Sequence, residues 1–178
     1  MPTLALSRAP HPGDRIGVLQ ISDRYDYGAE RTVARTVQSD LRNELLDMGF
    51  QAFDARATYD ELRRFEQGNA DYYVEIVSSH SQHNPVGGVG VDVGAVGATV
   101  SVVVSRVAAE VRLYDGRTLE MIERYDLRSQ NTAVLPTAVG IGGRHIFAFF
   151  AIPFVQYAQY RAAAHSVARD AAIRVAGR

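Results

Sequence analysis

Cysteine and lysine are both missing from the 178-residue sequence. Without cysteine, the chain has no disulfide framework, no thiolate zinc site and no cysteine nucleophile. Without lysine, its 19 basic residues are all arginines, and they nearly balance 20 acidic residues to leave a net charge of −1. A nucleic-acid-binding domain usually has a pI above about 9. This charge balance excludes a strong electrostatic footprint for nucleic acid, and we expect no nucleic-acid partner.

Long apolar stretches are missing as well. The most apolar run, IFAFFAIPFV at residues 146–155, contains Pro153 and is only half as long as the roughly 20 residues of a membrane-spanning helix. The N-terminal segment MPTLALSRAPHPGDR has no basic n-region and no long apolar h-region, so it does not match a signal peptide. Two interpretations stay open: a cytoplasmic protein, or an exported, lipid-anchored protein whose leader and anchor cysteine are not in this chain.

Length and composition predict one globular domain. A chain of 178 residues fits a single domain, and its apolar content of 47% is close to the globular average. We expect residues 1–14, which contain Pro10, Pro12 and Gly13, to form an extended tether. Residues 15–178 then form the domain.

The first half of the chain alternates strand and helix signals. Glu30–Met48 carries an apolar stripe at helical spacing and is followed by Gly49, a residue suited to a left-handed helix end. Thr58 and Glu61 match a capping box, in which a hydroxyl and a carboxylate satisfy free N–H groups at a helix start. The predicted elements are a strand at residues 15–22, a helix at 30–48, a strand at 50–54, a short helix at 58–65 and a strand at 71–79.

The second half predicts a long hairpin followed by a helix. Apolar and polar residues alternate along Thr99–Tyr114 and again along Thr118–Leu127, so one face of the hairpin should pack on a core. Asp115-Gly116 between them is a strong tight-turn signal. An alanine-rich helical pattern covers residues 154–176. Together these elements predict an α/β (α+β) two-layer sandwich, in which helices pack on a mixed, mostly antiparallel sheet.

Two apolar, glycine-rich segments interrupt this pattern, and we predict both as insertions. The first follows a polar linker at His80–Pro85 and covers residues 85–105, where the sequence from Val86 reads VGGVGVDVGAVGATVSVVVS. The second covers residues 131–152, where Arg144 is the only charged residue.

Motifs for catalysis or ligand binding are weak. The four glycines of residues 88–97 lead into β-type sequence rather than a helix, and their spacing does not fit a nucleotide-binding loop. His80 and His83 lack a third nearby ligand, whereas a catalytic zinc site takes three. No G-x-S-x-G elbow supports a hydrolase triad. We therefore predict no catalytic residues, no metal site and no cofactor.

Apolar residues of the two segments, with two tyrosines that follow the second, are the candidate interaction residues. Valines of the first segment alternate with small or polar residues, which is typical of a lipid-facing hairpin and equally of a half-buried strand. In the second segment both faces are apolar. Tyrosine is favoured where apolar surface meets water. The candidates are Val89, Val91, Val93, Val100, Val102, Ile146, Phe147, Phe149, Phe150, Tyr157 and Tyr160.

The order of these segments resembles a known family. ADYYVEIVSS, the run GGVGVDVGAVGATVSVVVSRVAAEVRLYDGRTLEMI and a second apolar segment before a C-terminal helix are similar to the curli secretion-channel lipoproteins (the CsgG family). The layout also resembles the TolB N-terminal domain and the LpoB-type activators of penicillin-binding proteins. The most similar part is Ala70–Ile122. In the curli family two inserted hairpins from each subunit assemble into an outer-membrane β-barrel, and the resemblance places them here at residues 85–105 and 131–152.

The resemblance implies a non-enzymatic, periplasmic protein held at the outer membrane by a lipid anchor. Such a protein would bind another envelope protein, as an accessory, regulator or inhibitor, or would associate with itself. The alternative is a subunit of a secretion pore whose inserted hairpins form a barrel. An enzyme is the third class, and it would require a pocket with convergent titratable side chains.

Overall fold

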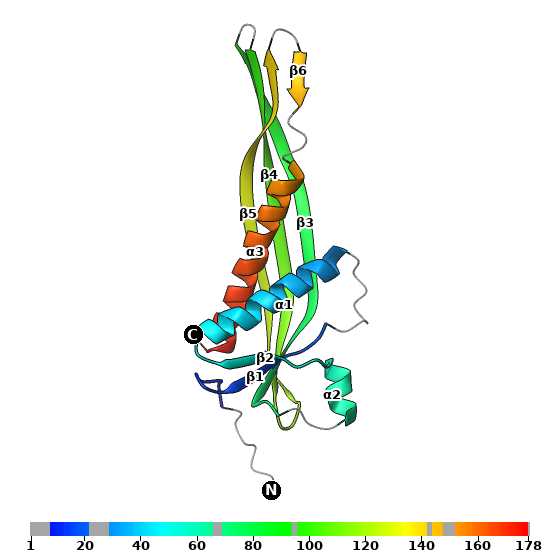
Figure 1. The fold of residues 1–178 in the computed structure, drawn as a ribbon, viewed down its shortest axis with the longest axis vertical. Helices are drawn as coiled ribbons and strands as arrows, with labels where there is room; N and C mark the ends of the chain where they lie inside the picture. Colours follow the sequence, from blue (N-terminus) through cyan, green and yellow to red (C-terminus); the bar gives the residue numbers. More distant parts are fainter. Residues whose placement is uncertain are drawn as a thin grey trace.

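A computed structural model describes residues 8–21, 29–65, 69–93, 96–141, 144–147 and 152–177. Along these residues the elements are β1 (Arg15–Val18), α1 (Ala29–Asp47), β2 (Gln51–Asp54), α2 (Tyr59–Phe65), β3 (Tyr72–Val93), β4 (Val96–Asp115), β5 (Met121–Ile141), β6 (Arg144–Phe147) and α3 (Ile152–Val175). Figure 1 shows α1, α2 and the short strands β1 and β2 gathered at one end, with β3, β4 and β5 extending away from them and β6 beside their far ends.

One open sheet holds the described strands together in the order β2-β1-β3-β4-β5-β6. β1 pairs with β2 and β3 in parallel, and the remaining pairs are antiparallel. Helices α1 and α3 pack together on one face, while α2 lies on the opposite face. The predicted fold class, a two-layer α/β sandwich with a mixed and mostly antiparallel sheet, is confirmed.

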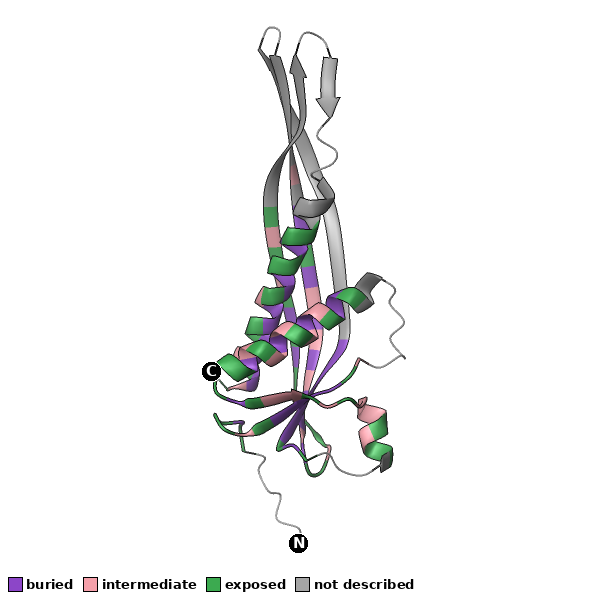
Figure 2. Cartoon of the chain, viewed as in Figure 1, coloured by how far each residue is buried: buried purple, intermediate pink, exposed green. Residues whose placement is uncertain are grey.

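The main core lies between the sheet and the two long helices. The apolar stripe of α1 and the alternating set of β4 are buried. Figure 2 shows purple positions alternating with more exposed ones along both elements. Alternation works because successive residues of a strand point to opposite faces. The buried residues that carry this contact are Val33, Val37, Leu41 and Leu45 of α1 and Val107, Ala109, Val111 and Leu113 of β4.

Both predicted helix-end signals are confirmed. Gly49 follows α1 with a φ of 91°, the left-handed conformation in which glycine has no Cβ to clash. At the start of α2, the backbone N–H of Thr58 donates to Glu61 Oε2 (2.7 Å) and the N–H of Glu61 donates to Thr58 Oγ1 (3.3 Å). This reciprocal pair is a capping box.

The linker predicted at His80–Pro85 is wrong. β3 continues through this segment to Val93, paired with β4 along its length apart from two register shifts. The polar composition that indicated a linker belongs instead to a strand whose other edge is unpaired here. An exposed edge tolerates polar residues, and it also tolerates proline, which cannot donate a ladder hydrogen bond.

The turn after β4 is longer than predicted. Asp115 Oδ1 accepts hydrogen bonds from the N–H groups of Arg117 (2.8 Å) and Thr118 (2.9 Å), and Leu119 adopts a φ of 56°. The return strand begins at Met121 rather than Thr118. A register shift next to the turn then leaves Met121 exposed (54%), although its spacing predicted a core position.

Residues 8–14 are the described part of the segment predicted as a tether. Gly13 N–H donates to the carbonyl of Gly49 (2.8 Å), and the Tyr72 hydroxyl donates to the carbonyl of Arg8 (2.5 Å). Pro10 is buried. These contacts fasten this part of the segment to the domain.

Candidate interaction surface

The outer halves of β3, β4 and β5 form a narrow sheet that we call the distal ribbon: residues 83–93, 96–105 and 131–141, together with β6. At about 3.3 Å per residue, its ten-residue segment of β4 spans roughly 30 Å. Both segments predicted as insertions lie in or beside it. Their strands are continuous with the core strands (Figure 1), and their status as insertions stays a prediction.

The register of the distal ribbon sorts its residues into two sets. Residues directly opposite one another on neighbouring strands share a face of the sheet. One set of cross-strand rows is almost entirely apolar: Val89–Val100–Pro136, Val91–Ala98–Val139–Ile146 and Val93–Val96–Ile141–Arg144. The alternate rows are richer in small and polar residues: Gly88–Ser101–Leu135, Gly90–Thr99–Ala138–Phe147 and Asp92–Gly97–Gly140–His145.

The polarity of β4 inverts where the distal ribbon begins. Nearer the turn, the odd-numbered residues from Val107 to Leu113 are the apolar ones, and they face α1 and α3. Further out, the even-numbered residues from Val96 to Val104 are the apolar ones. Ser105, an odd-numbered residue, is buried and donates a hydrogen bond to Gln159 Oε1 of α3 (3.3 Å). The apolar positions of β4 in the distal ribbon therefore alternate in the opposite phase to the positions that face α1 and α3 nearer the turn.

Both long edges of the distal ribbon lack a neighbouring strand among the described residues. On the outer side of β3, pairing with β1 stops at Val74. On the outer side of β5, β6 pairs only with Ala138–Ile141. The edges at residues 75–93 and 121–137 therefore present backbone N–H and C=O groups that no described strand engages.

The candidate interaction residues fall into different environments. The register brings Val89, Val91, Val93, Val100 and Ile146 into the apolar rows, and Val102 continues them by its spacing, whereas Phe147 lies in an alternate row. The two α3 tyrosines separate, because Tyr157 is 59% exposed while Tyr160 is 6% exposed and belongs to the main core. Phe149 and Phe150 lie outside the described residues.

We call the rest of the described molecule, with β1, β2, α1, α2, α3 and the parts of β3, β4 and β5 nearer β1, the head. A polar network covers the head on the sheet face opposite α1 and α3. The Tyr114 hydroxyl donates to Glu75 Oε2 (2.7 Å), and Glu110 accepts hydrogen bonds or ion pairs from Arg112 (2.8 Å) and Arg124 (3.1 Å). Burial raises the pKa of Glu75, and the Tyr114 hydroxyl and Arg112 guanidinium only partly offset this effect. Burial and the neighbouring Glu75 raise the pKa of Tyr114, so its hydroxyl remains a donor.

Helix α2 lies over one end of this network. The Tyr59 ring stacks on Tyr114 with ring centroids 4.4 Å apart, and its hydroxyl donates to the carbonyl of Leu119 (3.0 Å). These contacts enclose a second, smaller core around Tyr73 and Leu19. Carboxyl groups with a perturbed pKa often mark functional sites. Glu75, however, is packed under Tyr114 and not in the cavity described below, so its role here is structural.

Replacing Glu75 with glutamine is expected to increase stability more at neutral pH than at pH 4. The folded-state pKa lies above the usual 4.5. The unfolded state therefore ionises first as pH rises, and wild-type stability falls until the folded-state pKa is passed. Urea unfolding of both proteins at the two pH values measures the difference. Exposed Glu120→Gln is the control, and a Glu75→Gln effect that is equal at both pH values would contradict this account.

Across the part of the chain that the structure describes, no three His, Asp or Glu side chains gather closely enough to hold a metal ion. The side chains of His80 and His83 lie outside that part. Within the described helices, none is long and apolar enough to cross a membrane.

Comparison with known proteins defines a shared fold. No family model and no curated protein matches the sequence. A solved structure described as a neuraminyllactose-binding hemagglutinin homologue from Helicobacter pylori is similar with a TM-score of 0.50 and 9% identity, over 94% of this chain and 90% of that chain. At this identity the likeness shows the fold alone.

Lipoproteins recur among the other similar structures. A Caulobacter crescentus protein described as a lipoprotein matches with a TM-score of 0.44 and 13% identity, over 92% of this chain and 88% of that chain. An uncharacterised lipoprotein B from Nitrosomonas europaea matches with a TM-score of 0.41 and 15% identity, over 98% of this chain and 90% of that chain. The narrower resemblance to the curli channel, TolB and LpoB stays a prediction.

Proposed function

We propose that the protein is a non-enzymatic, periplasmic component of the cell envelope that binds another envelope protein through its distal ribbon. The observation that carries this proposal is the pair of ribbon edges that no described strand covers, beside an apolar set of cross-strand rows. The envelope placement follows from the resemblance to envelope lipoproteins, and lipoproteins recur among the similar structures.

Strand addition is the binding mode that this geometry favours. An extended segment can pair with an exposed sheet edge, where main-chain hydrogen bonds supply affinity and contacts to alternate side chains supply specificity. The edges of β3 and β5 offer the main-chain hydrogen bonds, and the alternating rows offer the side-chain contacts. Natural sheets usually protect such edges. A long edge next to apolar rows is therefore expected to be covered in the working complex.

Mass measurements distinguish this proposal from the pore alternative. We expect light scattering to give the same small species, a monomer or dimer, in plain buffer and in mild detergent. A pore subunit would form a ring only in detergent and would conduct ions across a lipid bilayer. That result would overturn the binding proposal in favour of the pore.

Cross-linking at neighbouring positions on opposite ribbon faces tests the surface itself. Val100 lies in an apolar row and Thr99 in an alternate row of the same strand. A photo-reactive residue at Val100 is expected to give a discrete adduct with another envelope protein in cells of the source organism, and one at Thr99 a weaker adduct. A photo-reactive residue at exposed Asn43 on α1 is the background control. Equal labelling from all three positions, or adducts containing only this chain, would contradict the proposal.

A further inference from the structure

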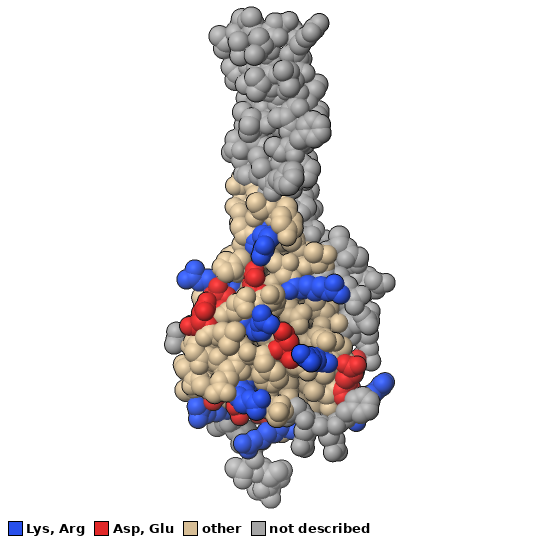
Figure 3. All heavy atoms as spheres, in the orientation of Figure 1, with Lys and Arg blue, Asp and Glu red and all other residues tan. Residues whose placement is uncertain are grey.

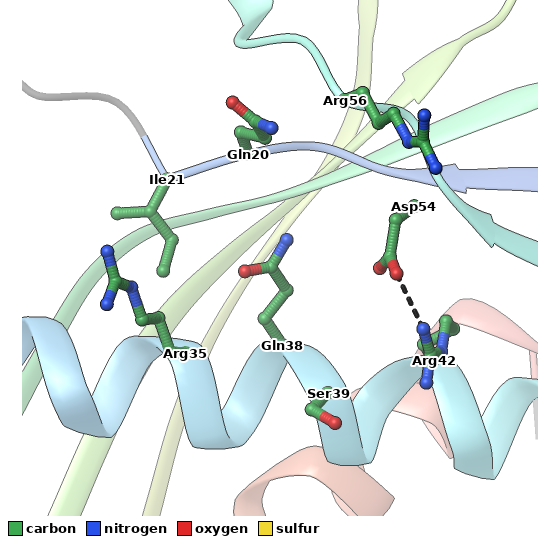
Figure 4. A pocket seen from close by; sticks show the side chains of 8 residues that line it. All are labelled: Gln20, Ile21, Arg35, Gln38, Ser39, Arg42, Asp54 and Arg56. Atoms are coloured by element: carbon green, nitrogen blue, oxygen red, sulfur yellow. Dashed lines mark hydrogen bonds and ion pairs between the residues drawn. The ribbon is translucent and has the colours of Figure 1, made fainter.

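A polar cavity of about 510 Å³ lies in the head, away from the distal ribbon. It opens between α1 and the segments that follow β1 and β2. Figure 4 shows Arg35 beside Ile21 at one end and Arg42, Asp54 and Arg56 at the other, with Gln38 between them. Arg35, Gln38 and Arg42 share one face of α1, because residues three and four apart on a helix are neighbours. Gln20 follows β1, and Arg56 follows β2. Its volume falls within the range of small-ligand sites, about 300–1,000 Å³.

The position of this cavity matches a general rule for α/β sheets. The connection from β1 to β2 runs through α1 on one face, and the connection from β2 to β3 runs through α2 on the other. The two crossovers therefore diverge at the carboxyl ends of β1 and β2. Ligands of open α/β sheets bind outside the carboxyl ends of the strands, and this cavity lies at the carboxyl ends of β1 and β2.

The cavity lining carries excess positive charge. Three arginines line it against one carboxylate, Asp54, which already accepts an ion pair from Arg42 Nη1 (2.5 Å). Among the described residues, no carboxylate lies within ion-pair distance of Arg35 or Arg56. Counted over the described residues, the lining therefore has a formal charge of +2, from three guanidiniums less one carboxylate. Elsewhere on the head, basic and acidic side chains are intermingled, as the face in Figure 3 shows.

Two further observations set this lining apart. Arg56 adopts a φ of 52°, a left-handed conformation that is costly for a residue with a Cβ. Such strain persists where the surroundings fix the residue, and it is concentrated at ligand-binding sites. Arg42 Nε is buried and has no hydrogen-bond partner among the described residues. Both features belong to arginines that line the cavity.

We propose that this cavity binds a small ligand through a phosphomonoester group. A phosphomonoester carries a charge of about −1.5 to −2 at pH 7 and three acceptor oxygens, which matches the lining charge of +2. A single guanidinium fork can donate to two phosphate oxygens, and the cavity offers such a fork at each end, Arg35 at one and Arg56 at the other. The cavity is larger than a phosphate, so the rest of the ligand would meet Gln20 and the side-chain oxygen of Gln38, whose Nε2 already donates to the carbonyl of Leu19 (3.0 Å). This proposal does not depend on the function of the distal ribbon.

Titration calorimetry of the full chain tests the proposal with glycerol 3-phosphate as the probe. We expect saturable binding that weakens at least about tenfold in Arg35→Gln or in Arg56→Gly, depending on which end of the cavity holds the phosphate, since hydrogen bonds to charged groups are among the strongest. Arg56→Gly removes a cavity charge and also relieves the left-handed strain, so its melting temperature should not fall. Exposed Arg161→Gln on α3 is the matched control and should bind like the wild type.

Further ligands identify the source of the group. Vesicles containing phosphatidic acid present the same phosphomonoester on a lipid, so variant-sensitive binding to vesicles alone would place the ligand in the membrane. Succinate has the same charge without the phosphate geometry and should bind weakly. The proposal is overturned if no phosphomonoester saturates the protein at millimolar concentration, if succinate binds as tightly, or if folded Arg35→Gln and Arg56→Gly both bind like Arg161→Gln.

Discussion

Alanine in place of Gly116 is expected to lower the free energy of unfolding by about 2–4 kcal/mol, the range for overpacking combined with a lost hydrogen bond. A Cβ built at Gly116 would lie 2.0 Å from the carbonyl oxygen of Ala70 and 2.7 Å from the backbone of Asp71. These atoms belong to main chain rather than to a flexible side chain. The turn would therefore have to move away.

That movement would break contacts that join the turn to the head. The N–H of Gly116 donates to the carbonyl of Asp71 (2.8 Å), and Asp71 in turn bonds to Arg15 through both its N–H (2.9 Å) and its carboxylate (2.8 Å). Urea unfolding measures the loss. The neighbouring exposed Arg117→Ala should change stability by less than about 0.5 kcal/mol, and a Gly116→Ala protein with an unchanged unfolding midpoint would contradict the predicted clash.

Two adjacent leucines of α1 are expected to behave very differently. Leu45 is 0% exposed in the main core, whereas Leu46 is 46% exposed. Leu45→Ala should cost about 2–5 kcal/mol, because it loses buried apolar surface and leaves a cavity. Leu46→Ala should cost less than about 1 kcal/mol, since a surface substitution loses little packing.

The two variants provide a matched test of the core. They remove the same atoms from neighbouring positions on one helix, so differences in helix propensity cancel. The measurement is the free energy of unfolding from denaturant titration of each protein. Losses of similar size would show that the contact between α1 and the sheet is not the main source of stability in the head.

Local signals predicted the head well. The stripe of α1, its end at Gly49 and the capping box of Thr58 and Glu61 depend on residues within a few turns, and all three are present. The alternation from Val107 to Leu113 likewise predicted which face of β4 is buried. Patterns of this kind follow from the backbone geometry of one helix or strand, so they can be recognised without knowing which elements pack against it.

Features that depend on distant segments were missed. Apolar and polar residues alternate on both sides of Ser105, and the apolar positions change from odd to even numbers there. That change can be interpreted only once α3 is known to contact β4 at Ser105. The spacing of Arg35 and Arg42 indicates a basic face on α1. Arg56 lies near this face only because β1 and β2 pair in parallel, which the sequence does not show. Strand continuity through Pro85 could not be predicted either, because it depends on which edge of β3 is free.

Continuity of β3, β4 and β5 has a mechanical consequence. The same three strands build the head and its projection, and in the described residues no loop separates the two parts along β4. A pull at the far end would act along the strands, so many ladder hydrogen bonds would bear the load together rather than one after another. Through Tyr72–Val74 that load reaches β1, the strand beside the arginine-lined cavity. Tension applied to the distal ribbon would therefore be transmitted along continuous strands to the strand beside the cavity.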